Sequence, residues 1–334
     1  MRKRLVAAGV VLVLLVVPVV LNGGLRGGRA LAEQRRSPVL IGVLTESWGP
    51  TPDVAALRDG LQEIGYRENE HFVIGVRFTQ GDPAALPVAA RELVQLGADI
   101  LVTSGGGHVV KAAQAATSRL PIIFIGSTDP VALGLVKTFN RPGGNITGIA
   151  DLDIELVPKR LEIFREIIPD LKRVLLPYDA TDSLAVSQLN VYRDAARRLG
   201  VTLVEKPVRT QEEAGVAITG ARRGAVDGIL SPRYLSLNIP GFMLEAAIAQ
   251  RIPTMFHGSW YVQRGGLASY AANDYELGKQ AARLLDKVLK GAKPGDLPVE
   301  QPTKFELVIN LKTATALGLT IPPSVLARAD KVIE

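Results

Sequence analysis

Short runs of β-branched and other apolar residues alternate with longer stretches of helical hydrophobic spacing along most of the chain. Residues 39–44 contain no polar side chain, which is typical of a strand that is covered on both faces. Residues 54–64 then repeat apolar positions at helical spacing, and Gly65 ends that pattern. Such alternation of strand and helix predicts an α/β fold with parallel sheets and right-handed crossovers.

The alternation runs through the chain twice. The first run predicts strands at 39–44, 71–78, 100–102 and 121–125, and helices at 54–64, 86–96, 109–116 and 130–136. The second run predicts helices at 157–168, 183–199, 212–221 and 241–250, and strands at 173–176, 201–207, 228–230 and 253–256. Two runs indicate two Rossmann-like lobes, with a crossover at residues 148–153.

The remaining segments are too small to form a third domain. They comprise a short strand at 268–270, an amphipathic helix at 275–289, a Gly/Pro linker at 290–298, a strand at 305–310 and a helix at 313–317. These pieces must dock on the two lobes, and several crossings between lobes make a hinge.

The first 32 residues have the order of a secretory signal peptide. Three basic residues at positions 2–4 precede 17 uncharged residues, 5–21, and Ala30-Leu31-Ala32 offers a cleavage site after Ala32. The alternative is an uncleaved membrane anchor, for which this run is at the short limit. We expect cleavage and export to the periplasm.

Removing this leader changes the charge of the chain. The leader holds five of the 39 basic residues and none of the 33 acidic ones, which leaves 34 against 33. No basic surface is then expected for nucleic acid. The absence of cysteine excludes thiol catalysis and Cys-ligated zinc, and three histidines are too few for a His-rich metal site. We expect no metal and no cofactor.

Ligands of open parallel sheets bind at the carboxyl ends of the strands. After the first strand, Trp48 either stacks on a ligand or covers the core. After the third strand, Ser104, Gly105 and Gly106 open a helix, and its free N–H groups favour an anion such as a carboxylate. The alternative for these glycines is a tight turn. After the fourth strand, Ser127 and Thr128 offer hydroxyls, whereas Asp129 before a proline also fits an ordinary N-cap.

In the second run, aromatic residues gather at the strand ends, although they are scarce elsewhere. An aromatic wall with a few polar groups is a usual small-molecule site, although any single ring could simply cover core. The candidates are Tyr178, Tyr234, His257, Trp260 and Tyr261. Two further candidates, Tyr270 and Asp274, lie at the crossover, where Asp274 also fits an N-cap.

Several segments resemble the tryptophan/tyrosine-type family of ABC transporter substrate-binding proteins, which have the type I periplasmic-binding fold. The match covers nearly all of residues 38–334, and its specific segments are 57–66 (LRDGLQEIGY), 129–136 (DPVALGLV), 141–148 (RPGGNITG), 301–310 (QPTKFELVIN) and 316–322 (ALGLTIP). One departure is the first loop, where Glu46 and Trp48 stand in place of small residues and could narrow the pocket.

The resemblance implies two lobes joined by three crossovers, with a small polar or amino-acid-like solute bound between them. The first lobe would comprise 38–150 plus about 271–298, and the second 151–270 plus about 303–334. The family places charged ligand groups at loops that match Ser104-Gly105 and Ser127-Thr128-Asp129 here. It also implies a permease with a cytoplasmic ATPase as partners, and we expect a monomer.

Two other functions compete with transport. A sensor module for a membrane receptor uses the same fold. A hydrolase or isomerase using Asp129, His108 or His257 is less favoured, because Gly-x-Ser-x-Gly and His-Glu-x-x-His motifs are absent from the sequence.

Overall fold

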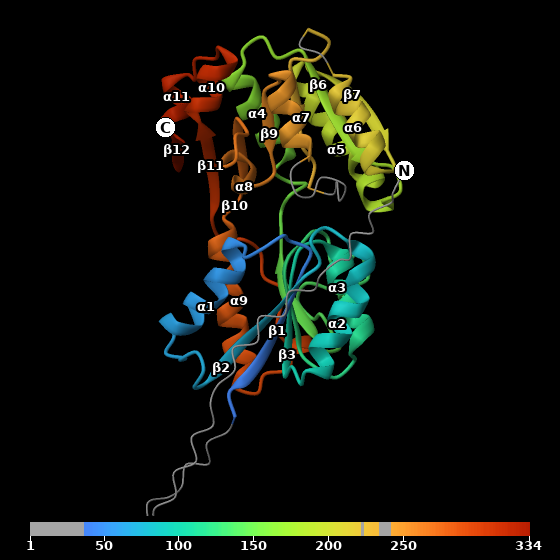
Figure 1. Cartoon of the computed structure of the whole chain (residues 1–334), viewed down its shortest axis with the longest axis vertical. Coiled ribbons are helices and arrows are strands. Elements are labelled where there is room, and N and C mark those ends of the chain that lie inside the picture. Colours follow the sequence, from blue (N-terminus) through green and yellow to red (C-terminus); the bar gives the residue numbers. More distant parts are fainter. Residues whose placement is uncertain (1–36, 222–223, 234–241) are drawn as a thin grey trace, which may run out of the picture. The chain divides into compact units, whose positions relative to one another are not determined.

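The computed structural model describes residues 37–221, 224–233 and 242–334 (Figure 1). The expected leader, residues 1–32, lies outside these ranges. Within them, no helix combines the length and the apolar character needed to cross a bilayer. The described chain forms two α/β lobes with mostly parallel sheets, which confirms the predicted fold class.

The first sheet has the strand order β2-β1-β3-β4-β5, and its pairs are parallel. Its strands are β1 (Val39–Thr45), β2 (Phe72–Phe78), β3 (Ile100–Ser104), β4 (Ile122–Ser127) and β5 (Ile146–Ala150). The accompanying helices are α1 (Pro52–Glu63), α2 (Leu86–Gln95) and α3 (Gly107–Ala116), with a 3-10 turn at η1 (Pro83–Ala85). Leu44 packs with α2 and α3, whereas Ile41 and Val43 pack with α1, so both faces of the sheet are covered as the apolar run predicts.

The second sheet has the order β12-β11-β10-β9-β8-β6-β7, with β10 and β11 antiparallel. Its strands are β6 (Arg173–Asp179), β7 (Thr202–Val208), β8 (Gly228–Leu230), β9 (Thr254–Phe256), β10 (Ala268–Ala272), β11 (Phe305–Asn310) and β12 (Lys331–Ile333). Its helices are α4 (Val157–Ile167), α5 (Ser183–Leu199), α6 (Gln211–Thr219), α7 (Phe242–Gln250), α8 (Ser259–Val262), α10 (Leu311–Leu317) and α11 (Pro323–Leu326).

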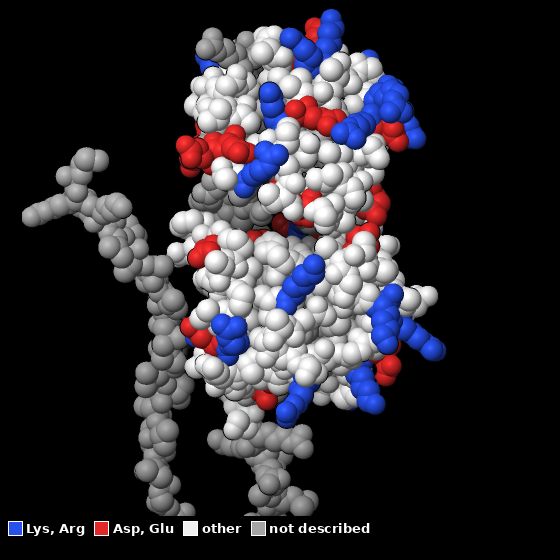
Figure 2. All heavy atoms as spheres, turned by 90° about the vertical axis from the view of Figure 1, so that its right-hand side faces the viewer, with Lys and Arg blue, Asp and Glu red and all other residues white. Residues whose placement is uncertain are grey.

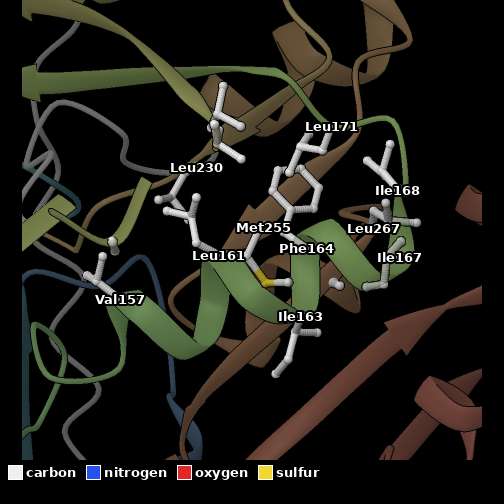
Figure 3. Close-up of a cluster of buried hydrophobic side chains, with 14 of the residues drawn as sticks. Val157, Leu161, Ile163, Phe164, Ile167, Ile168, Leu171, Leu230, Met255 and Leu267 are labelled. Atoms are coloured by element: carbon white, nitrogen blue, oxygen red, sulfur yellow. The ribbon is translucent and has the colours of Figure 1, made fainter. Parts of the chain in front are cut away.

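The core of the second lobe shows the same two-sided burial. Leu161 and Phe164 of α4 pack with Met255 of β9 and Leu230 of β8 in one cluster (Figure 3). Leu175, one residue along β6 from members of that cluster, belongs instead to the cluster on the α6 and α7 side. Successive residues of a strand point to opposite faces, so β6 joins two separate cores.

The chain crosses between the two sheets three times. It leaves β5 for α4, returns from β10 into α9 (Asp274–Leu289), and leaves again after η2 (Pro294–Asp296) for β11. On the last crossing, Glu300 pairs with the edge strand β5: its N–H donates to Gly148 O at 2.9 Å, and its carbonyl accepts from Ala150 N at 2.9 Å. The strand ends beside these crossings are therefore held close together.

Helix α9 packs along α1 and carries chain from the second half of the sequence onto the first sheet. Leu277, Ala281 and Leu285 share a buried cluster with Leu57 and Leu61 of α1. The helices approach closely because small residues lie between them, as in the pairing of Gly60 with Ala282. This contact explains why the amphipathic pattern at 275–289 does not form a separate domain.

The elements differ from the sequence prediction in a few places. Residues 130–136 form consecutive turns and not the predicted helix, with Gly134 at a φ of 68°. Strands β5 and β12 and helices α8 and α11 were not expected from the pattern, because each is only three to five residues long. The predicted helix at 241–250 begins at a residue outside the described ranges, and α7 starts at Phe242.

Gly278 allows the close approach of α9 to α1, and we predict that Gly278→Ala destabilises the protein. A Cβ at this position would lie 2.1 Å from Asp53 O and 2.7 Å from the Cβ of Ala56. Alanine normally stabilises a helix interior by about 1 kcal/mol over glycine, but overpacking here should cost about 1–3 kcal/mol instead. Urea unfolding measures the difference. Gly49→Ala, which meets nothing within 4 Å, is the control. A stability gain in Gly278→Ala would contradict this packing.

Candidate solute-binding site

The carboxyl ends of β1, β3 and β4 bring buried hydroxyl groups to one edge of the first sheet. Thr45 is paired in register with Ser104, and Ser127 lies at the end of β4 beside Ala150. All three hydroxyl residues are buried. After Ser104 the chain turns at Gly105, whose φ of 137° suits glycine, and α3 begins two residues later. The first amides of α3 have no acceptor within the helix.

Asp151 follows β5 and binds the loop after β4. Its N–H donates to the carbonyl of Ser127 at 3.2 Å. Its Oδ1 accepts from the hydroxyl of Thr128 and from the N–H of Asp153 at 3.1 Å. These hydrogen bonds hold the first crossing against the polar carboxyl ends of the first sheet's strands.

Arg233 reaches the same carboxylate from the second lobe. It follows β8, and the N–H of Ser231 donates to Met255 O at 2.9 Å, which continues the strand pairing. Arg233 Nε lies 3.1 Å from Asp151 Oδ2, and Arg233 Nη2 donates to Gly126 O at 3.2 Å. One side chain thus connects the strand ends of the two sheets.

Asp153 forms a second ion pair, which is fully buried. Arg160 of α4 donates from Nη2 to Asp153 Oδ1 at 2.5 Å and from Nη1 to the Asp153 carbonyl at 3.2 Å. Its Nε donates to the carbonyl of Tyr270 on β10 at 2.7 Å. A buried ion pair needs such additional hydrogen bonds to offset desolvation. Arg160 therefore holds two of the three crossings together.

The pKa values of the two aspartates are shifted in opposite directions. Burial raises the pKa of Asp151 to about 6, although Arg233 opposes that shift and Asp153 adds to it. Burial also acts to raise the pKa of Asp153, but the charges of Arg160 and Arg233 and the hydrogen bond from Arg160 outweigh it, so that pKa is lowered. Asp153 is the permanent anion of this cluster, and Asp151 is the carboxylate whose charge depends on its surroundings.

Asp274 adds another carboxylate from the second crossing. Burial raises its pKa to about 7, and Asp53 and Glu306 add to the shift whereas Arg233 opposes it. Asp274 is the first residue of α9, but the N-cap is Asn273, whose side chain accepts from Glu276 N at 3.0 Å. The capping role expected for Asp274 is therefore wrong. Its carboxylate is influenced by other acidic groups, among them Asp53 and Glu306.

His257 and its aromatic neighbours form the second lobe's contribution. Burial lowers the pKa of His257 to about 3, so the imidazole is neutral at physiological pH. Its ring centroid lies 5.1 Å from that of Tyr261, which also stacks on Phe256 at 4.6 Å. Burial raises the pKa of Tyr261 to about 12, and the charges that influence it include Arg233, Glu46 and Asp274. Tyr261 also packs against the buried cluster of the second lobe that contains Phe256.

Glu46, directly after β1, pairs with His108 at the start of α3, and His108 Nε2 lies 2.6 Å from Glu46 Oε2. Burial acts to lower the pKa of His108, but Glu46 and the more distant Asp182 outweigh it and raise the pKa. Asp182 caps α5 in the second lobe, so this pair also responds to a charge across the lobes. Figure 2 shows a crevice in which acidic and basic side chains lie close together.

The structure places the residues predicted from sequence in different situations. Ser104, Gly105, Gly106, Ser127, Thr128, His257 and Asp274 lie at the strand ends and crossings described above. Trp48 is 51% exposed in the loop after β1. Asp129 is exposed and accepts from Ala132 N at 3.0 Å, capping its own turn. Tyr234 lies outside the described residues.

Two predicted tyrosines pack within the second lobe. Tyr178 lines a cavity of about 10 Å³ together with Tyr192 and Pro232, space for at most one water molecule. Tyr270 packs against the second lobe's core, and its ring centroid lies 6.4 Å from that of Phe305. Both rings therefore cover core in this conformation, which is the alternative that the sequence left open.

Several buried polar atoms near these crossings have no hydrogen-bond partner among the described residues. They include Ser127 Oγ from the first lobe and Ser231 Oγ, His257 Nδ1 and Asp153 Oδ2 from the second lobe and the crossing. Buried polar atoms are normally paired, so each unpaired one requires an explanation. The carbonyl of Ser127 accepts from Asp151 N, and Ser231 lies two residues before Arg233. The described residues contain no group of His, Asp and Glu that could hold a metal ion.

Sequence reasoning missed the ionic centre, namely Asp151, Asp153, Arg160 and Arg233. One signal was present for Arg160, which lies between Val157 and Phe164 on the buried face of its helix. A charge on an apolar face indicates a buried partner. Asp151 and Asp153 lie in the crossover that the pattern identified, but nothing local indicates that Arg233 would reach them.

Residues 41–333 match the family of ABC transporter substrate binding proteins. The chain belongs to this family, whose members bind a solute outside the cytoplasm for a permease and are not enzymes. The resemblance seen in the sequence is confirmed. A tyrosine-binding protein from Clostridioides difficile (strain R20291) is 29% identical over 261 residues, which cover 78% of this chain and 74% of that protein.

Solved structures agree with this assignment. The ABC domain from Streptococcus pneumonia, in complex with L-Trp, has a TM-score of 0.78 and 30% identity, and the match covers 89% of this chain and 100% of that one. A conserved domain protein from Vibrio cholerae has a TM-score of 0.77 and 32% identity, covering 88% and 99%.

We predict that Asp274→Asn makes the ligand-free protein less sensitive to rising pH. Because the folded-state pKa is raised to about 7, the stability linked to this group is present below pH 4 and is lost as the pH rises through 7. Relative to wild type, the free energy of unfolding of the variant should be roughly 1–3 kcal/mol more favourable to the folded state at pH 8 than at pH 5. Chemical denaturation at both values measures this, with exposed Asp170→Asn as the control. Equal pH slopes for Asp274→Asn and wild type would contradict a raised pKa.

We predict that Arg160→Met is strongly destabilising, because it leaves the buried Asp153 carboxylate without its cation. The loss should be about 3–5 kcal/mol, whereas Lys159→Met, which removes an exposed pair with Glu162, should cost less than about 1 kcal/mol. Urea unfolding of the two neighbouring variants makes the comparison. Adding Asp153→Asn to Arg160→Met should restore part of the loss, and a double variant no better than the single one would argue against an unpaired charge.

Proposed function

We propose that this protein is the periplasmic solute receptor of an ABC importer and that it binds an amino-acid-like solute between its two lobes. The observation that supports this most directly is the set of unpartnered buried polar atoms, Ser127 Oγ, Ser231 Oγ and His257 Nδ1, at the ends of strands from both sheets. A solute with several polar groups would satisfy them together, and closure of the lobes would exclude water from it.

The charges of the site fit a zwitterion. The amides at the start of α3 and the hydroxyl of Ser127 suit a carboxylate. Burial, together with neighbouring carboxylates such as Asp53, raises the pKa of Asp274, so an ammonium group beside it would stabilise its ionised form. Tyr261, whose ring centroid lies 5.1 Å from that of His257, is among the described residues the nearest aromatic group to this histidine. The tyrosine-binding relative and the L-Trp complex support aromatic amino acids as the first solutes to test.

The rest of the proposal concerns the protein's organisation. The first lobe comprises residues 38–150 with about 271–298, and the second comprises 151–270 with about 303–334. The leader is cleaved after Ala32, and the mature protein is a monomer that delivers its solute to a permease driven by a cytoplasmic ATPase. The docking of α9 on α1 supports these lobe limits, because it joins 274–289 to the first sheet.

We predict that L-tryptophan or L-tyrosine raises the melting temperature of the mature protein and that Ser127→Ala weakens this binding. Loss of one buried hydrogen bond to a charged group should weaken affinity roughly tenfold or more. Isothermal titration measures the affinity, and exposed Ser324→Ala is the matched control.

The solute class and the site are tested separately by this experiment. If neither amino acid binds, a broad solute library with the same thermal readout follows, since ligand at a hundredfold excess over Kd stabilises by about 2.7 kcal/mol. No stabilisation by any solute would contradict the proposed function. Unchanged affinity in Ser127→Ala would contradict only the proposed site.

A further inference from the structure

Arg233 is a described side chain that connects the two lobes at the proposed solute cleft. Its backbone belongs to the second lobe, directly after β8, whereas its guanidinium contacts Asp151 Oδ2 and Gly126 O at the carboxyl ends of strands of the first sheet. The pair is largely shielded, with Asp151 3% and Arg233 24% exposed. Shielded charge pairs are weakened little by salt, unlike pairs at the surface.

The first lobe is shaped to receive this guanidinium. Gly126 has a φ of 75°, and a Cβ at this position would lie 2.8 Å from Arg233 Nη2. Glycine therefore lets the arginine approach the backbone carbonyl. The opposite oxygen of Asp151, Oδ1, is already occupied by Thr128 and by the Asp153 amide, which leaves Oδ2 directed at Arg233.

The ammonium group of a solute would also bind these two kinds of acceptor, a carboxylate oxygen and a carbonyl oxygen. Arg233 occupies them with a group of the protein itself. Separation of the lobes must break both contacts and leave the buried Asp151 charge without its cation, which is costly.

We propose that Arg233 is an interlobe latch: it stabilises the closed arrangement of the lobes in the absence of solute by bonding Asp151 and the Gly126 carbonyl. This inference rests on the proposed function only in that the latch acts on the proposed cleft. Solute entry requires the latch to open first. Arg233 thereby sets the ratio of open to closed protein, and with it the apparent affinity for every solute that enters the open form.

The latch is tested by measuring the distance between the lobes without any solute. The chain has no cysteine, so a single pair can be introduced at the exposed positions Val88 on α2 and Val216 on α6, one in each lobe, and labelled with fluorophores. Loss of the ion pair with Asp151 and of the hydrogen bond to the Gly126 carbonyl should raise the ratio of open to closed molecules roughly tenfold or more in Arg233→Met. Arg193→Met, which breaks an exposed pair with Glu205 within one lobe, should leave the ratio unchanged.

Further variants test the cause of the shift. Arg233→Lys keeps a cation near Asp151 and should stay closer to wild type than Arg233→Met. Asp151→Asn removes the anionic partner and should open the protein in the same direction, which covers the case that Arg233→Met does not fold. A wild-type ratio in Arg233→Met and Asp151→Asn would overturn the latch, and equal opening by Lys and Met would overturn its ionic basis. Because no solute is present, failure of solute binding would leave this result unaffected.

Discussion

The structure around the cleft depends on the burial of two carboxylates, Asp151 and Asp153, in the first crossing between the lobes. Neither can remain ionised away from water without a cation and several donors. Arg160 serves Asp153 and at the same time binds the carbonyl of Tyr270, so it holds two crossings together. Arg233 forms an ion pair with Asp151 from the second lobe. Ion pairs and hydrogen bonds therefore connect the first crossing with the carboxyl ends of the first sheet's strands and with the end of β8.

The same constraint shapes the electrostatics of the site. Among the described residues, two arginines, Arg160 and Arg233, act on Asp151, Asp153 and Asp274, and burial keeps the pKa of Asp151 and of Asp274 high. The neutral His257 adds no positive charge, because burial lowers its pKa to about 3. A solute that brings a cationic group would relieve this excess of acid. The family defines the class of the protein, and the raised pKa values of Asp151 and Asp274 support the proposal that a cationic group of the solute lies beside the crossings.

Most of the fold could be predicted from the sequence because burial on both faces leaves a clear periodic pattern. Residues 183–199 were predicted as a helix that Gly200 ends, and α5 has these bounds; in the structure Asp182 caps its start. The turns at 130–136 were mistaken for a helix because their apolar spacing is helical, whereas Gly134 at positive φ interrupts it. The place of Ser127 and His257 at the ends of strands could be predicted, because each lies at the end of a short apolar run. Arg233 was not singled out, because its partners are far away in sequence and its role arises only when the lobes meet.

The most direct test of the account is a crystal structure of the mature protein grown with L-tryptophan or L-tyrosine. The account predicts the solute between the lobes, with its carboxylate within hydrogen-bond distance of Ser127 Oγ and the first amides of α3, and its ammonium group beside Asp274. A solute bound elsewhere, or bound in the cleft with Ser127 Oγ, His257 Nδ1 and Asp274 all left without contact to it, would contradict the account.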